Sequence, residues 1–345
     1  MTGKERALAA LDHRPTDHVS IFPSVDVAAS AKYIDKPVGQ CFVDPVLHAR
    51  SLEAVLDRHP GIDGVYINLC LTGRTASKVG PDRYSDGTLQ WRVPENDIGT
   101  VAVRTIEDPE DPLLLEANPL QDGILDTYRA VEASYKDRFL ILPGITGPYS
   151  HLTFLYGLEN TMMLMLDDPD LMHRFLRRRT ELAIAWGTEL ARCGAEAVWI
   201  GEGAASGSLL PLRLYQEFVQ PYAAAVVDAM RGLGVRTLMH VCGDINATAA
   251  AVAATGADGI DVDHMVPTSF VASQAKRPVC IKGNLDPVAL LRSTPQQVQH
   301  LCRQIIATAP QHFILGTGCL VARDTPPENI DAMLAAIQYN QEVTQ

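Results

Sequence analysis

The chain has 345 residues, of which 47% are apolar and 20% charged, and a formal net charge of −12. This is the composition of a globular protein with one large domain or two smaller ones, and the acidic balance argues against nucleic acid as a partner. No apolar run approaches the roughly 18 residues of a membrane span. The charged start "MTGKERALAALDHRP" and the odd count of seven cysteines favour free thiols in the cytoplasm rather than export.

Short apolar runs alternate with helical segments along the whole chain. We predict strands at residues 19–23, 64–69, 139–143, 197–201, 236–241, 258–262, 279–282 and 313–316. Continuous rather than alternating apolar strands indicate burial on both faces, as in a parallel sheet. Eight such units predict an α/β fold of the (β/α)8 TIM-barrel class. An open, doubly wound sheet would show the same alternation and stays an alternative.

Several helix starts have specific signals. Residues 167–194 predict a long amphipathic helix that begins at Asp168 and Pro169 and ends at Gly194. Pro295 and Pro326 are expected at the first helical position. Three pairs have capping-box spacing: Thr2 with Glu5, Thr294 with Gln297, and Thr325 with Glu328.

The segment from about residue 70 to residue 120 is too long for a simple strand-to-helix connection. It contains "YSDGTLQWRV" and "TVAVRTI", which are typical of a hairpin. We expect this insertion to cover or line the mouth of the barrel. Because no repeat or linker divides the chain, residues 1–345 are predicted to form a single domain with this insertion.

Polar residues follow the predicted strands, where a barrel places its chemistry. They are Ser24, Asp26, Asn68, Cys70, Tyr149, His151, Glu202, His240, Cys242, Asp263, His264, Asn284, Asp286 and Cys319.

The pattern with the most specific chemistry is "LMHVCGD", which contains His240 and Cys242. Residues i and i+2 share one face of a strand, and Cys319 follows the last strand in "GTGCLV". Two thiolates and one imidazole favour zinc, and three protein ligands leave a fourth position open, as in catalytic sites. The alternative is two ordinary buried cysteines and a core histidine.

An open zinc site of this kind would have a definite use. It could bind an incoming thiol, keep it as a thiolate at neutral pH and so prepare a nucleophile. Glu202 is the candidate catalytic base; it could instead occupy the fourth position when substrate is absent, or only orient other groups.

The chain resembles the uroporphyrinogen decarboxylase superfamily over essentially its whole length. The stretches that carry the resemblance are "ERALAALDHRPTDHVSIFP", "GPYSHLTFLYG", "PLRLYQEFVQPY", "HVCGD", "GNLDP" and "TPPENI". Decarboxylases carry an arginine-rich loop after the first strand, where this chain reads "FPSVDVAASAKY", and a histidine where it has Cys319. His-x-Cys with the late cysteine instead resembles the zinc motif of the corrinoid-dependent methyltransferases, such as the methylcobamide:coenzyme M methyltransferases. The segment "EGAASGSLLP" after the fourth strand is also similar to that branch.

The resemblance implies the barrel fold and zinc ligation by His240, Cys242 and Cys319. It also implies methyl transfer between a corrinoid (methylcobamide), usually carried by a separate corrinoid protein, and a zinc-activated thiol. Tyr149, Asp263 and Asn284 are candidates for binding the small-molecule substrate.

Three other functions stay open. The chain could be a zinc-dependent demethylase that passes a methyl group from a methoxy or methylamino compound to the corrinoid protein. It could also be a porphyrinogen decarboxylase, which needs no metal, or a non-catalytic protein that binds a corrinoid or a thiol.

Overall fold

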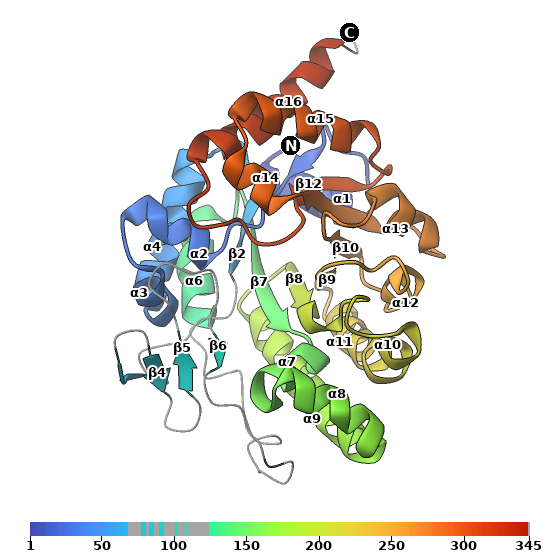
Figure 1. The fold of residues 1–345 in the computed structure, drawn as a ribbon. Coiled ribbons are helices and arrows are strands. Elements are labelled where there is room, and N and C mark those ends of the chain that lie inside the picture. Colours follow the sequence, from blue (N-terminus) through green and yellow to red (C-terminus); the bar gives the residue numbers. More distant parts are fainter. Residues whose placement is uncertain are drawn as a thin grey trace.

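A computed structural model describes residues 1–67, 77–80, 83–85, 90–92, 101–102, 108 and 124–343. Parallel strands surrounded by helices dominate the described chain (Figure 1). The eight strands of the main sheet are β1 (Ser20–Ile21), β2 (Gly64–Ile67), β7 (Leu140–Thr146), β8 (Ala197–Gly201), β9 (Arg236–Val241), β10 (Gly259–Val262), β11 (Cys280–Leu285) and β12 (Phe313–Thr317). All eight predicted strands are therefore confirmed. Strands β7 and β11 run three residues beyond the predicted ends, because the ladder continues through glycines that the sequence pattern treats as breakers.

The strand order decides between the barrel and the open sheet. Hydrogen-bonded neighbours follow the order β1-β12-β11-β10-β9-β8-β7-β2, and every pair is parallel. β1 and β2, the two ends of this order, meet at a place that we call the seam of the barrel. There the Asp63 amide donates to the Ile21 carbonyl over 2.7 Å, and the Tyr66 amide donates to the Val25 carbonyl over 3.1 Å. The TIM-barrel prediction is confirmed, and the doubly wound alternative is wrong.

Helices occupy most of the rest of the described chain. They are α1 (Gly3–Leu11), α2 (Val27–Ser30), η1 (Ala31–Ile34), α3 (Val38–Val43), α4 (Pro45–Arg58), α6 (Ile124–Tyr135), α7 (Pro148–Tyr156), α8 (Leu158–Asp167), α9 (Pro169–Arg192), η3 (Gly203–Ala205), α10 (Leu212–Phe218), α11 (Gln220–Gly232), α12 (Ala249–Ala253), α13 (Thr268–Gln274), α14 (Pro287–Arg292), α15 (Pro295–Ala307) and α16 (Pro327–Val343). None of the helices in the described ranges has the length and apolarity needed to cross a bilayer.

Two of the three predicted capping boxes form, at Thr2 and at Thr294. The third is wrong: α16 begins at Pro327, and the Thr325 hydroxyl is buried without a hydrogen-bond partner in the described ranges. The cause is the pair of prolines, because a residue that precedes a proline is disfavoured in the helical region. Pro326 therefore stays outside the helix, and Thr325 is one position too early to cap it.

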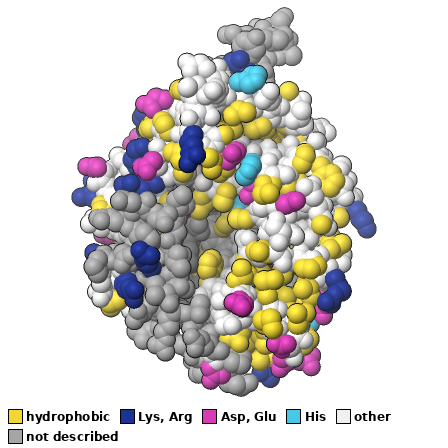
Figure 2. Space-filling view, viewed as in Figure 1, with side chains coloured by type: hydrophobic (Ala, Val, Ile, Leu, Met, Phe, Trp, Pro, Cys, Tyr) yellow, Lys and Arg dark blue, Asp and Glu magenta, His cyan; other side chains and the backbone are white. Residues whose placement is uncertain are grey.

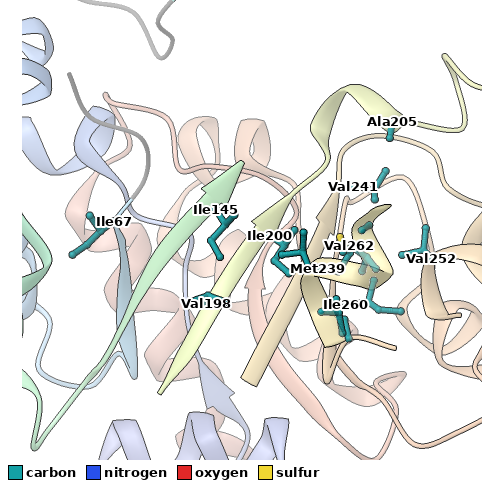
Figure 3. Packing of buried hydrophobic residues seen from close by; sticks show 14 of the residues in the cluster. Ile67, Ile145, Val198, Ile200, Ala205, Met239, Val241, Val252, Ile260 and Val262 are labelled. Atoms are coloured by element: carbon teal, nitrogen blue, oxygen red, sulfur yellow. The ribbon is translucent and has the colours of Figure 1, made fainter. Parts of the chain in front are cut away.

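The core has an outer and an inner part, because alternate strand residues point out of and into the barrel. Outward side chains such as Ile145, Ile200 and Val262 belong to the large cluster that also contains the buried faces of the helices (Figure 3). Inward residues near the amino ends of the strands form a second cluster with α1, in which Leu11 approaches Gly259. Helix α1 thus closes the amino end of the barrel, opposite the end where barrels place their sites.

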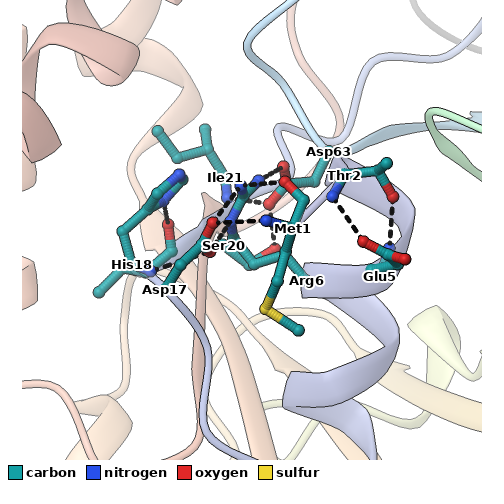
Figure 4. Close-up of polar contacts among 10 residues, drawn as sticks. Met1, Thr2, Glu5, Arg6, Asp17, His18, Ser20, Ile21 and Asp63 are labelled. Carbon is teal, nitrogen blue, oxygen red and sulfur yellow. Dashed lines mark hydrogen bonds and ion pairs between the residues drawn. The ribbon is translucent and has the colours of Figure 1, made fainter.

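A buried carboxylate joins α1 to the seam of the barrel (Figure 4). Asp63 accepts from the Arg6 guanidinium and from the Ser20 hydroxyl, each over 2.5 Å, and from the Ile21 amide over 2.9 Å. Arg6 also pairs with Asp17 over 2.7 Å. This ionic cluster therefore connects β1 to β2, the two neighbouring strands that are not paired by a ladder.

The predicted hairpin is confirmed within a small antiparallel sheet after β2. Its strands are β3 (Ser77–Lys78), β4 (Arg83–Ser85), β5 (Gln90–Arg92) and β6 (Val101–Ala102), paired in that order. Most other residues of the insertion lie outside the described ranges, so a role in covering the barrel mouth stays a prediction.

Candidate metal centre

The fold brings His240, Cys242 and Cys319 together at the carboxyl end of the barrel. Their ligand atoms all lie within 4.8 Å of one another, and His240 Nε2 is 3.0 Å from Cys242 Sγ. Zinc binds sulfur at about 2.3 Å and imidazole nitrogen at about 2.0–2.1 Å, so one ion can contact all three atoms. Within the described ranges, no other group of three His, Cys, Asp or Glu side chains has this spacing. The donor set therefore fits zinc.

The pKa values of the two thiols are shifted in opposite directions. A hydrogen bond with Cys242 and the neighbouring His240 lower the pKa of Cys319 to about 4, although burial opposes the shift. The same hydrogen bond and burial raise the pKa of Cys242. These opposite shifts favour a thiolate at Cys319, which would bind a cation, while Cys242 would lose its proton on binding.

His240 is held from the side opposite the sulfurs. Its Nδ1 lies 3.1 Å from the Asp261 carbonyl oxygen and 3.4 Å from the Asp261 carboxylate. The ring of Trp199 stacks on the imidazole with 5.3 Å between centroids and an angle of 26°. These contacts leave Nε2 to face Cys242.

Glu202 follows β8 directly and is fully buried. Its carboxylate accepts from the amides of Tyr149 (3.2 Å) and Ser150 (2.8 Å), which are two of the unpaired donors at the start of α7. Burial raises the pKa of Glu202 to about 7, against these hydrogen bonds. The carboxylate therefore caps α7 in this structure, and its role as a base or fourth ligand stays a prediction.

The chain at Glu202 nevertheless passes beside the metal centre. A Cβ added at the next residue, Gly203, would lie 3.3 Å from the Cys242 sulfur.

The predicted substrate-binding residues fall into two kinds. Tyr149 is fully buried and its hydroxyl has no hydrogen-bond partner within the described part of the chain, as is also true of Tyr215 on α10. Asp263 instead accepts from the Gly243 amide over 2.9 Å, and Asn284 donates to the Val266 carbonyl over 2.7 Å. Asp263 and Asn284 thus brace the loops around Cys242. A contact of any of the three predicted residues with substrate stays a prediction.

The remaining polar residues at strand ends have mostly local roles. Asp26 caps α2, Asp286 caps α14, His264 pairs with Asp263, and His151 lies in α7. Asn68 and Cys70 lie outside the described residues.

Sequence reasoning missed a polar layer inside the barrel, which contains Asp261, Lys282, Tyr66 and Trp199. Asp261 and Lys282 are almost fully buried and form an ion pair of 3.0 Å. The available signal was a charged residue at an inward position within each of two predicted strands: Asp261 in "DGIDV" and Lys282 in "VCIK".

Comparison with known proteins agrees with the resemblance in the sequence. The model of the uroporphyrinogen decarboxylase (URO-D) family matches residues 2–339. The chain belongs to this family. A solved structure, a methyltransferase from Methanosarcina mazei, shares the fold over the whole of both chains with a TM-score of 0.85 at 20% identity.

The curated relatives include members of both branches. The chain is 28% identical over 252 residues to a methylated-thiol–coenzyme M methyltransferase of Methanosarcina mazei, which is 72% of this chain and 66% of that protein. It is 26% identical over 350 residues, 97% of each chain, to the methylcobamide:CoM methyltransferase MtaA of Methanosarcina barkeri. A uroporphyrinogen decarboxylase of Anaeromyxobacter dehalogenans is 28% identical over 230 residues, 62% of each chain. The methyltransferases support the predicted branch.

Proposed function

We propose that this chain is a corrinoid-dependent methyltransferase that uses zinc to activate a thiol acceptor. The observation that carries the proposal is the set of two sulfurs and one imidazole within reach of one ion, at the carboxyl end of a barrel. Relatives named methylcobamide:CoM methyltransferases support a methylated corrinoid as donor and a thiol as acceptor. An intact three-ligand set with an open position also favours catalysis over binding alone.

The candidate site residues would have separate roles in the reaction. His240, Cys242 and Cys319 would hold zinc, which when bound stabilises the anionic form of an acceptor thiol. Glu202 is our candidate for the group that takes the thiol proton, because a carboxyl with a pKa of about 7 can exchange protons at neutral pH. The acceptor sulfur would attack the methyl carbon of the corrinoid co-substrate, and the electron pair of the broken methyl–cobalt bond would stay with the corrinoid. The products would be a thioether and the corrinoid reduced by two electrons.

Exposed apolar side chains support a protein-borne corrinoid as the methyl donor. They lie on the segments that follow β7 and β8, over α7, α8 and the start of α10, a region of the surface where apolar side chains gather in Figure 2. Surface patches of this kind are typical of protein–protein contacts. The residues are Phe154, Leu158, Met163, Leu166, Leu209 and Leu212.

Decarboxylation of a porphyrinogen has less support. Binding several carboxylates calls for several cationic groups, and the chain after β1 contains no arginine from Phe22 to Tyr33. Those residues form α2 and η1 instead, with their alanines buried.

The decisive experiment compares metal content and turnover in wild type and in Cys319→Ser. We expect wild type to carry one zinc per chain and to methylate a thiol with methylcobalamin, and Cys319→Ser to lose both zinc and turnover. Cys193→Ser, at the end of α9, is the matched control and should retain both. Unchanged zinc in Cys319→Ser would show that the third ligand is wrong. Methyl transfer at the full rate by zinc-free wild type would refute the mechanism.

A further inference from the structure

A buried ion pair lies at the level of His240 inside the barrel. Asp261 on β10 is the register partner of His240 on β9 and, on its other side, of Lys282 on β11. The three residues therefore stand side by side across three neighbouring strands. Lys282 is fully buried and Asp261 is 2% exposed.

Three side-chain donors are directed at the Asp261 carboxylate, while His240 Nδ1 lies beside the Asp261 carbonyl oxygen. Lys282 Nζ donates to Oδ1 over 3.0 Å, while the Tyr66 hydroxyl (3.0 Å) and the Trp199 indole nitrogen (3.1 Å) donate to Oδ2. Lys282 is itself held by the Ser24 hydroxyl over 2.7 Å. Side chains from β2, β8 and β11 thus fix the position of one carboxylate.

The barrel fold does not require the buried charges of Asp261 and Lys282. Barrel interiors are normally filled by branched apolar side chains, and the inward cluster toward α1, with Leu140, Leu238 and Ile314, follows that rule. Removing two charges from water costs free energy that their attraction often fails to recover. The polar residues are concentrated at the level of His240, which indicates that they serve the histidine.

The effect on His240 follows from the geometry. Both acceptors near Nδ1, the carbonyl and the carboxylate, belong to Asp261, so Nδ1 is the ring nitrogen that donates to Asp261. Nε2 is left to face the sulfur of Cys242 and is the nitrogen that would bind zinc after losing its proton. The stacked ring of Trp199, which also donates to Asp261, restricts rotation of the imidazole.

We propose that Asp261 is the positioning residue of the metal centre, and that Lys282, Tyr66 and Trp199 hold it in place. It orients His240 so that Nε2 is presented to zinc. Lys282 offsets the carboxylate charge, because an uncompensated anion next to two thiolates would repel the acceptor thiolate that must enter the fourth position. This inference rests on the proposed zinc centre but not on methyl transfer itself.

The test measures zinc affinity rather than activity. Zinc dissociation constants are determined by competition with a chelator for wild type, Asp261→Asn and Asp63→Asn. Asp63 is the matched control, since it is also a buried carboxylate in an ion pair, at the α1 end of the barrel. We expect Asp261→Asn to weaken zinc binding by about 10- to 100-fold, and Asp63→Asn to lower stability while binding zinc as wild type does.

A second readout follows the geometry of the site directly. The visible absorption of the Co²⁺-substituted protein should change in Asp261→Asn and stay as wild type in Asp63→Asn. If Asp261→Asn does not fold, Trp199→Phe takes its place, because it keeps an aromatic ring over His240 and removes only the indole donor. Its zinc affinity should fall several-fold.

The outcomes separate this inference from the proposed function. Wild-type zinc affinity and Co²⁺ spectrum in Asp261→Asn, or in Trp199→Phe where that variant replaces it, would overturn the positioning role and leave the metal centre intact. Failure of wild type to bind zinc would refute the metal centre and this inference together.

Discussion

His48, on α4, shows how a single buried residue couples the stability of the protein to pH. It is fully buried, neither ring nitrogen has a hydrogen-bond partner among the residues that the structure describes, and burial lowers its pKa to about 3. The histidine is therefore neutral in the folded chain at pH values where an unfolded chain, with a pKa near 6.5, is protonated. The unfolded state binds the extra proton, so stability is lost as pH falls below about 6.5.

Replacing this residue gives a direct check. His48→Leu removes both the proton and two unsatisfied nitrogens, so we expect a higher free energy of unfolding than in wild type. The difference should widen by about 1.4 kcal/mol for each pH unit below about 6.5. Urea unfolding at pH 5, 6 and 7 measures it. A constant difference over this range would contradict the burial argument.

The three candidate zinc ligands could be predicted from the sequence, but the residues that hold His240 in place could not. His240 and Cys242 are recognisable because the two-residue period of a strand puts them on one face. Cys319 is recognisable because it follows the last strand, whose carboxyl end lies at the same end of a closed barrel. The partners of Asp261 lie on three other strands, and no local pattern connects Tyr66 or Trp199 to that carboxylate. Only the register of the closed sheet brings them together.

Helix α7 begins at a site shared with Glu202. Gly147, the residue before the helix, has no side chain, and a Cβ added there would lie 2.2 Å from the carboxyl carbon of Glu202. The close approach lets the carboxylate reach the amides of Tyr149 and Ser150. The glycine is therefore required by packing and not by backbone conformation.

A one-methyl substitution at this glycine should disturb the whole helix start. Gly147→Ala is expected to displace the carboxylate, leave two amides unsatisfied and cost about 2 kcal/mol of stability. Gly232→Ala at the end of α11 is the control, since an added Cβ there meets no atom within 4 Å; it should be neutral or stabilising by up to about 1 kcal/mol. Equal effects of the two substitutions, measured by thermal unfolding, would refute the packing argument.

The start or end of a helix could be predicted where a single residue type, such as a capping aspartate or a terminal glycine, marked it. Asp168 caps α9 as expected, and Gly194, with φ +98°, follows the end of that helix. The start of α16 was not predictable from capping-box spacing, because two successive prolines compete for the first position.

The barrel as a whole depends on a seam that has no strand ladder. β1 and β2 are connected by two backbone hydrogen bonds and by the cluster of Arg6, Ser20 and Asp63. Removing Arg6 would leave Asp63 as a buried charge without its cation. Arg6→Ala should therefore lower the free energy of unfolding by about 3–5 kcal/mol, measured by urea unfolding at neutral pH. A loss below about 1 kcal/mol would show that the seam is held by other contacts.

The number of strands was enough to predict a closed barrel, because eight strand–helix units match that architecture. The detail of the insertion was less predictable: its strands are two or three residues long, and β3 has no pattern of its own. That residues 1–345 form one domain stays a prediction.

The proposed metal centre takes its ligands from β9 and its end and from the turn after β12, and this division has a consequence for biosynthesis. Cys319 follows Cys242 by almost eighty residues. During synthesis, His240 and Cys242 therefore leave the ribosome well before the third donor. The three proposed ligands cannot come together until β12 and the turn after it have been synthesised. Tight zinc binding at the proposed centre would therefore accompany docking of β12 into the sheet.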